Sequence, residues 1–148
     1  MVQAALALND AERVERFHAS LERAGADPAF LDRFYSAFQA VSPEIEAMFR
    51  DTDMSRLKRK LEASLHLVTL AIDEEPGARD YLEYLGRVHA RFALQPEHFR
   101  LWIDALVATV ADTDPAFDAG LEQDWRGVLS AAIQRMDKGL DRGLRRRA

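Results

Sequence analysis

The chain has 148 residues, of which 48% are hydrophobic and 30% are charged. This length and composition are typical of one folded domain with a buried core, and they exclude a disordered chain. The formal net charge of −5 disfavours general binding to nucleic acid, and the lack of cysteine excludes disulfides, zinc–thiolate centres, iron–sulfur clusters and thiol catalysis.

The hydrophobic stretches are too short for a membrane span, because none approaches the roughly 20 residues that such a helix needs. The apolar N-terminal extension, residues 1–9, lacks the basic start and the cleavage site of a signal peptide. We therefore expect a cytoplasmic protein. The basic C-terminal tail, residues 142–148, is interpreted as a solvated helix end rather than a binding patch.

The N-terminal third of the chain predicts three helices. Residues 9–12 (Asn-Asp-Ala-Glu) form a capping-box pattern before an apolar helical stripe, and Gly25 is a stop signal. An Asp-Pro pair at residues 27–28 opens a second helix, and a Ser-Pro pair at residues 42–43 opens a short third one. The second helix has a dense aromatic face, made of Phe30, Phe34, Tyr35 and Phe38.

Four further helices are expected over residues 54–72, 78–92, 96–111 and 117–139, with a break at residues 112–115. No segment shows the alternation or the hairpin signals of β-strands. The sequence therefore predicts an all-α fold. We expect a single domain covering the whole chain, without repeats or linkers.

His89 ends an apolar face of the expected helix 78–92. It follows Leu85 by one turn, and a corner and a new helix with Pro96 at its first position come directly after it. A single histidine on such a face is more often a structural residue than a ligand. Other positions must therefore decide its role.

Several of those positions resemble bacterial globins. The Phe-Tyr pair at residues 34–35 and the Ser-Pro-Glu-Ile and Met-Phe motifs within residues 42–49 are similar to the family's second helix and its corner. The Val-His and Pro-Glu-His-Phe motifs within residues 88–99 resemble the segment around its iron-binding histidine, and Trp125 also matches. The resemblance covers residues 14–136 and implies a globin fold of about seven to eight helices around one haem pocket.

The resemblance implies haem b as the cofactor and His89 as the ligand of its iron. Phe49 would stack on the porphyrin at the corner. Lys60 would pair with a haem propionate, with the other basic residues of its helix as alternatives. The apolar side chains expected to line the pocket are Leu61, Leu65, Leu85, Leu94, Phe99 and Ile103.

The ligand-binding side of the pocket is expected to contain Leu57 and Tyr35. Leu57 occupies the position of a histidine or glutamine in many globins and offers no hydrogen bond. The Tyr35 hydroxyl could donate to O₂ bound in a dry pocket, worth about 1–3 kcal/mol. This pair is similar to the one in globin-coupled sensors. The alternative is a core tyrosine bonded to a backbone carbonyl.

The remaining histidines are expected outside the pocket. His66 is rotated away from the stripe that begins at Leu57. His98 faces solvent or caps a helix, and His18 lies too far away on the first helix. Since no second histidine can complete the coordination, we expect a five-coordinate or water-ligated iron.

These features predict a protein that reversibly binds O₂, and also CO and NO, for oxygen binding or transport or for NO-related and redox roles. Conversion of NO to nitrate would need a separate reductase, so the chain by itself is not expected to be an enzyme. Nucleic acid and membranes are not expected partners, and a homodimer through the last two helices stays open. The alternatives are a haem-free globin-fold sensor or interaction module and an unrelated all-α dimerisation module.

Overall fold

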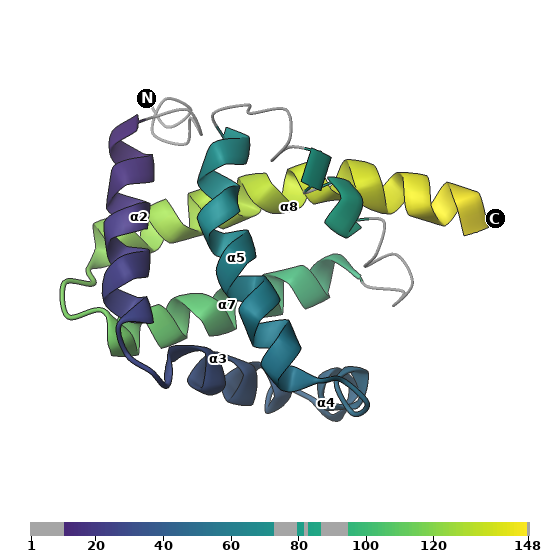
Figure 1. Cartoon of the computed structure of the whole chain (residues 1–148), viewed down its shortest axis with the longest axis horizontal. Helices are drawn as coiled ribbons and strands as arrows, with labels where there is room; N and C mark the ends of the chain where they lie inside the picture. Colours follow the sequence, from purple (N-terminus) through teal and green to yellow (C-terminus); the bar gives the residue numbers. More distant parts are fainter. Residues whose placement is uncertain (1–10, 73–79, 82, 87–94, 148) are drawn as a thin grey trace.

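The computed structural model describes residues 11–72, 80–81, 83–86 and 95–147, and it confirms the all-α class. Within these ranges no residue belongs to a β-strand. Figure 1 shows α2 and α5 crossing over α7 and α8, while α3 packs along α7. The helices are α2 (Ala11–Gly25), α3 (Phe30–Gln39), α4 (Pro43–Met48), α5 (Met54–Ile72), α7 (Pro96–Thr113) and α8 (Ala119–Arg147).

Several predicted helix boundaries are confirmed, and local chemistry explains them. Helix α2 ends at Gly25, and α5 spans residues 54–72 as expected. The Ser42 side chain accepts a hydrogen bond from the Ile45 amide at 3.1 Å and thereby caps α4. Residues 80, 81 and 83–86 are helical, which agrees with part of the expected helix 78–92, whose other residues lie outside the described ranges.

The predicted start of the second helix is wrong by two residues. The Asp27 carboxylate accepts the Ala29 amide at 2.8 Å, which closes a turn, and α3 begins only at Phe30. A short polar side chain that bonds the backbone two residues on forms such a turn as readily as a helix cap.

The last two helices also differ from their predicted bounds. Helix α7 continues to Thr113, where Asp114 ends it in an extended conformation with its amide donating to the Val110 carbonyl. The Asp118 carboxylate accepts the Leu121 amide at 2.8 Å, so α8 begins at Ala119 rather than at residue 117. Helix α8 also runs on to Arg147.

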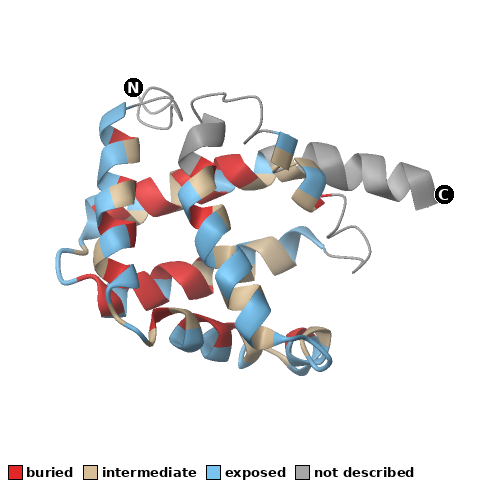
Figure 2. Ribbon diagram, viewed as in Figure 1, coloured by how far each residue is buried: buried red, intermediate tan, exposed pale blue. Residues whose placement is uncertain are grey.

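The core lies where α2, α3, α7 and α8 face one another (Figure 2). Phe17 of α2 and Trp125 of α8 are fully buried, with ring centroids 4.5 Å apart. Burying one large apolar side chain is worth about 1.5–3 kcal/mol, so this aromatic contact is a major link between the first and last described helices.

A buried polar cluster joins α2 to the start of α8 through the α7–α8 corner. The Trp125 indole donates to the Ser20 hydroxyl at 2.8 Å, and that hydroxyl donates to the Asp114 carboxylate at 2.6 Å. Arg23 forms two hydrogen bonds to the same carboxylate, at 2.6 and 3.0 Å. These bonds fix the corner against α2, because a buried carboxylate is stable only when it is fully bonded.

A second ion cluster links the same two helices. Asp124 is buried and accepts two hydrogen bonds from Arg16, at 2.7 and 3.1 Å. The Arg13 Nε atom lies 3.5 Å from Asp124 Oδ1, and the Arg13 side chain is also buried. Gly127 makes room for it, because a Cβ atom at that position would lie 2.4 Å from Arg13 Nη1.

Candidate functional site

Tyr35 and Phe49, two of the predicted site residues, are in direct ring contact. Tyr35 projects from α3 and is only 5% exposed, while Phe49 ends α4 and is half-buried. Their ring centroids are 5.9 Å apart at an interplanar angle of 70°, and Phe38 meets Phe49 in the same edge-to-face way. Such pairs add about 0.5–1.5 kcal/mol beyond area burial, so they fix the corner after α4 on α3.

The Tyr35 hydroxyl is a donor on a buried side chain, and it has no partner among the described residues. No hydrogen bond within the described part of the chain engages it, so the described residues do not contain the backbone carbonyl that a purely structural tyrosine would use. Burial raises the pKa of the phenol well above its ordinary value, because the charged form is poorly solvated there. The hydroxyl therefore keeps its proton and can donate it in a hydrogen bond.

The stripe on α5 packs into the core as its spacing predicts. Leu57 and Leu61 are half-buried against the core, and Leu65 is fully buried one turn later. The segment that contains Tyr81 and Leu85 lies against α5, because the Tyr81 hydroxyl is 3.2 Å from the Ser64 hydroxyl of α5. These positions give α5 an apolar face next to residues 80–81 and 83–86.

Phe99 and Ile103 of α7 share a hollow of about 300 Å³ with α8. The arginines at its rim, Arg100 and Arg126, both pair with Asp104, at 3.6 and 2.8 Å. The hollow is therefore apolar inside, and its rim charges are already neutralised. The other residues that line it are Pro96, Ser130 and Ile133.

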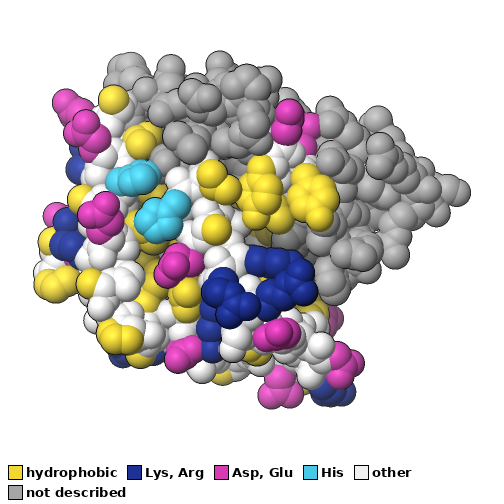
Figure 3. All heavy atoms as spheres, in the orientation of Figure 1, with side chains coloured by type: hydrophobic (Ala, Val, Ile, Leu, Met, Phe, Trp, Pro, Cys, Tyr) yellow, Lys and Arg dark blue, Asp and Glu magenta, His cyan; other side chains and the backbone are white. Residues whose placement is uncertain are grey.

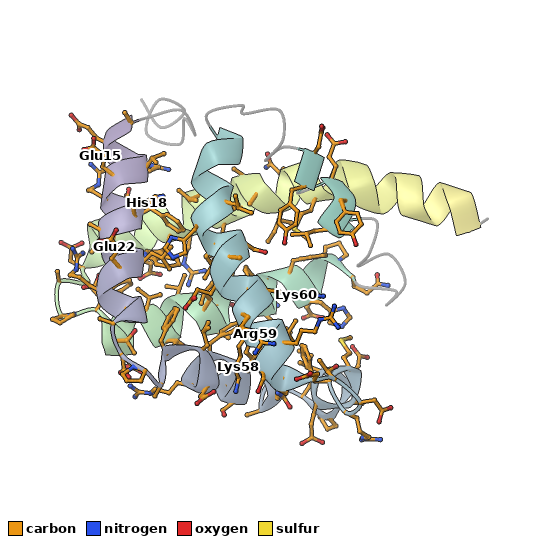
Figure 4. The ribbon with its side chains drawn as sticks, viewed as in Figure 1. Glu15, His18, Glu22, Lys58, Arg59 and Lys60 are labelled. Carbon is orange, nitrogen blue, oxygen red and sulfur yellow. The ribbon has the colours of Figure 1, made fainter. Side chains whose placement is uncertain are left out.

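Lys60 belongs to a basic patch on α5 that Figure 3 shows as one dark-blue surface. Lys58, Arg59 and Lys60 follow one another there (Figure 4), and Lys58 pairs with Asp32. Arg59 and Lys60 are exposed, and neither forms an ion pair with another described residue. They are therefore the cations of this patch that an incoming carboxylate would meet.

The predicted iron ligand, His89, and the predicted lining residue Leu94 lie outside the described residues. Their roles stay predictions.

His98 caps a helix, which is one of the two roles expected for it. Its Nδ1 atom accepts the Gln95 amide at 2.9 Å, the reciprocal half of a capping box at the start of α7. Its other nitrogen is 2.5 Å from a carboxylate oxygen of Glu44. His98 therefore ties α7 to α4, a contact that the sequence alone did not indicate.

His18 and His66 form a pair that the sequence did not predict. Their ring centroids are 6.2 Å apart, although they project from different helices, α2 and α5. His66 is exposed, which agrees with the expectation that it points away from the apolar stripe of α5. The crossing of the two helices brings these histidines together.

An all-α fold with a buried tyrosine–phenylalanine contact at the corner after a short helix and an apolar stripe on the next one has the features of a globin. The family model named Globin matches residues 32–136. The chain therefore belongs to the globin family. An unrelated all-α module, one of the alternatives above, is thereby excluded.

One solved structure is similar over most of the chain. It is the protein PA3967 of Pseudomonas aeruginosa PAO1, described as structurally highly homologous to a human haemoglobin. The two chains share 32% sequence identity with a TM-score of 0.80, and the match covers 86% of this chain and 98% of that one. No curated protein matches the sequence.

None of the helices in the described ranges combines the length and the apolar character needed to traverse a bilayer.

Proposed function

We propose that this globin binds haem b and, with it, the small ligands O₂, CO and NO. The observation that supports this most directly is Tyr35, whose side chain is only 5% exposed and whose hydroxyl is protonated and has no partner among the described residues. A bound ligand could accept a hydrogen bond from this hydroxyl, so Tyr35 fits the cofactor that is typical of the family.

Haem, when bound, would supply a ferrous iron at which O₂, CO and NO bind reversibly. His89 would hold the iron, and Phe49 would stack on the porphyrin. Lys60 would pair with a propionate, because it is exposed and has no ion pair among the described residues. The apolar lining would comprise Leu57, Leu61, Leu65, Leu85, Leu94, Phe99 and Ile103.

Tyr35 and Leu57 would together set the affinity for O₂ relative to the affinity for CO. Tyr35 would donate a hydrogen bond to a polarised ligand such as O₂, and it would offer less to CO. Leu57 excludes water and supplies no competing donor. A charge-assisted hydrogen bond of this kind is worth about 1.5–3 kcal/mol, or roughly 10- to 150-fold in affinity.

An absorption spectrum tests the proposal. We expect the purified protein with added hemin to give a sharp Soret band that shifts after reduction and exposure to CO. The band should be lost in His89→Gly, because that change removes the predicted iron ligand. A broad band of non-specifically bound hemin, equal in both proteins, would contradict the proposal and favour a haem-free interaction module.

A role in NO chemistry would follow only from a partner. Conversion of NO to nitrate consumes an electron for each cycle, and within this proposal a separate reductase supplies it. Oxygenated protein that fails to convert NO to nitrate would exclude that role without affecting ligand binding.

A further inference from the structure

The contact between His18 and His66 joins the exposed sides of α2 and α5 into one surface. The two rings project from different helices, and their centroids are 6.2 Å apart. Figure 3 shows two histidine side chains next to each other, with acidic side chains over α2 and the basic patch of α5 on the same face of the molecule. This surface, the α2–α5 face, consists of the exposed stripes that run through His18 on α2 and through His66 on α5.

The part of the α2–α5 face that belongs to α2 is acidic. Glu15 and Glu22 lie three residues before and four residues after His18, hence on the same side of α2, as Figure 4 shows. Both glutamates are exposed, and neither forms an ion pair with another described residue. Their negative charges therefore point into solvent.

The nearest cations of α2 do not neutralise these glutamates, because they are bonded elsewhere. Arg16 forms two hydrogen bonds to Asp124, and Arg23 forms two to Asp114. Both aspartates are buried, so these arginines are held toward the interior. The α2 end of the face is therefore negatively charged at neutral pH.

The other end of the face, at the start of α5, is basic. Arg59 lies seven residues before His66, and Arg56 lies one turn before Arg59, so the three share one side of α5. Both arginines are exposed, and within the described ranges neither forms an ion pair. Glu62 is the only acidic residue in the sequence of α5, whereas four cations lie within residues 56–60.

A face with one acidic and one basic end is complementary to itself. A twofold axis that lies in the face, close to the histidine contact, exchanges the two ends when a second copy is turned onto the first. The α2 glutamates of each copy then meet the α5 arginines of the other. The same contact forms twice, as in any dimer in which both subunits use the same surface.

The net charge of the chain opposes association, since each copy carries a formal charge of −5. Repulsion between whole molecules acts over long distances, and it is largely screened beyond about 10 Å at 0.1 M salt. Opposite charges in direct contact are much closer than this, so their attraction outlasts the repulsion at moderate salt.

We propose that the chain forms a homodimer through its α2–α5 face, in which Glu15 and Glu22 of each copy pair with Arg56 and Arg59 of the other. The interface therefore differs from the one through the last two helices that the sequence left open. Electrostatic complementarity of this kind selects the partner and its orientation.

Sedimentation velocity of the full chain tests the dimer. We expect a dimer at roughly 0.1 M salt, and a dissociation constant at least about tenfold higher at roughly 1 M salt, where charges are screened beyond about 3 Å. The acid-reversed variant, Glu15→Arg with Glu22→Arg, should be monomeric at concentrations at which the parent dimerises. So should the base-reversed variant, Arg56→Glu with Arg59→Glu. A parent that stays monomeric at 0.1 M salt, or variants that associate as the parent does, would overturn the proposal.

Mixing the two variants keeps the test independent of folding. The acid-reversed face is mainly basic and the base-reversed face is mainly acidic, so the two chains should form a heterodimer with each other. A chain with all four changes has its charged ends exchanged and should form a homodimer again. A variant that had merely lost its fold would not be restored in this way, and failure of either restoration would contradict the proposed pairing.

The matched control is Arg100→Glu with Arg126→Glu, which changes the net charge as the base-reversed variant does, but on α7 and α8. We expect it to dimerise as the parent does. Dissociation of the control alone would place the interface on the last two helices, and equal dissociation of the control and the base-reversed variant would mean that net charge governs association. Either result would overturn the proposal. None of these measurements depends on haem, so they are independent of the proposed function.

Discussion

At the scale of single residues, the candidate site depends on one hydroxyl group. Tyr35→Phe removes that group and keeps the ring that packs against Phe49. We expect O₂ to dissociate roughly 10- to 150-fold faster, since a charge-assisted hydrogen bond of about 1.5–3 kcal/mol is lost. CO dissociation should change much less. Stopped-flow displacement of O₂ by CO measures the first rate, and displacement of CO by NO measures the second.

The same variant separates a ligand-binding tyrosine from a structural one. Because no hydrogen bond joins the hydroxyl to another described residue, the free energy of unfolding should change by less than about 0.5 kcal/mol. Unaltered O₂ release together with a loss of more than about 1 kcal/mol in stability would identify Tyr35 as a structural residue instead.

At the scale of helices, replacing Gly127 of α8 would have two opposite effects on stability, because α2 packs closely against α8 at this position. Alanine is better than glycine inside a helix by about 1 kcal/mol, but its Cβ atom would lie 2.4 Å from the buried Arg13 side chain. We expect Gly127→Ala to destabilise the protein by up to about 2 kcal/mol net, since overpacking costs about 1–3 kcal/mol and the alanine recovers about 1 kcal/mol. In an Arg13→Ala background the same change should become stabilising. Urea denaturation of the four proteins gives this coupling, and additive effects would contradict the contact.

The helices also show which structural features local sequence patterns can predict. Helix α5 was predicted at both ends because a break at residues 51–53 and a regular apolar stripe are local signals. The start of α3 was not predicted correctly, because the Asp27 carboxylate accepts a backbone hydrogen bond within a turn instead of capping a helix. Tyr35 and Phe49 were predicted as site residues from family motifs, whereas the meeting of His18 with His66 arises from helix crossing, which no local pattern encodes.

At the scale of the whole molecule, the buried Asp114 cluster makes stability depend on pH. Burial alone would raise the pKa of this carboxyl. The hydrogen bonds from Arg23, Ser20 and the Ala116 amide, with the charge of Arg23, outweigh burial and hold the pKa below its ordinary value. A carboxyl whose pKa is lowered in the folded state stabilises the protein above its unfolded pKa of about 3.9, and this contribution is lost as the pH falls through the folded pKa.

Asp114→Asn tests this linkage across the fold, because the cluster joins α2, the end of α7 and α8. At pH 7 we expect a loss of about 1–3 kcal/mol, since asparagine carries no charge for Arg23. The gap between the variant and the parent should begin to narrow below about pH 4, where the carboxyl of the unfolded chain protonates, and it should narrow further as the pH approaches the lowered pKa of the folded state. Urea denaturation at pH 7, 5 and 3.5 measures the gap at each pH. A gap of constant size would mean that Asp114 acts through its shape and hydrogen bonds alone, without its charge.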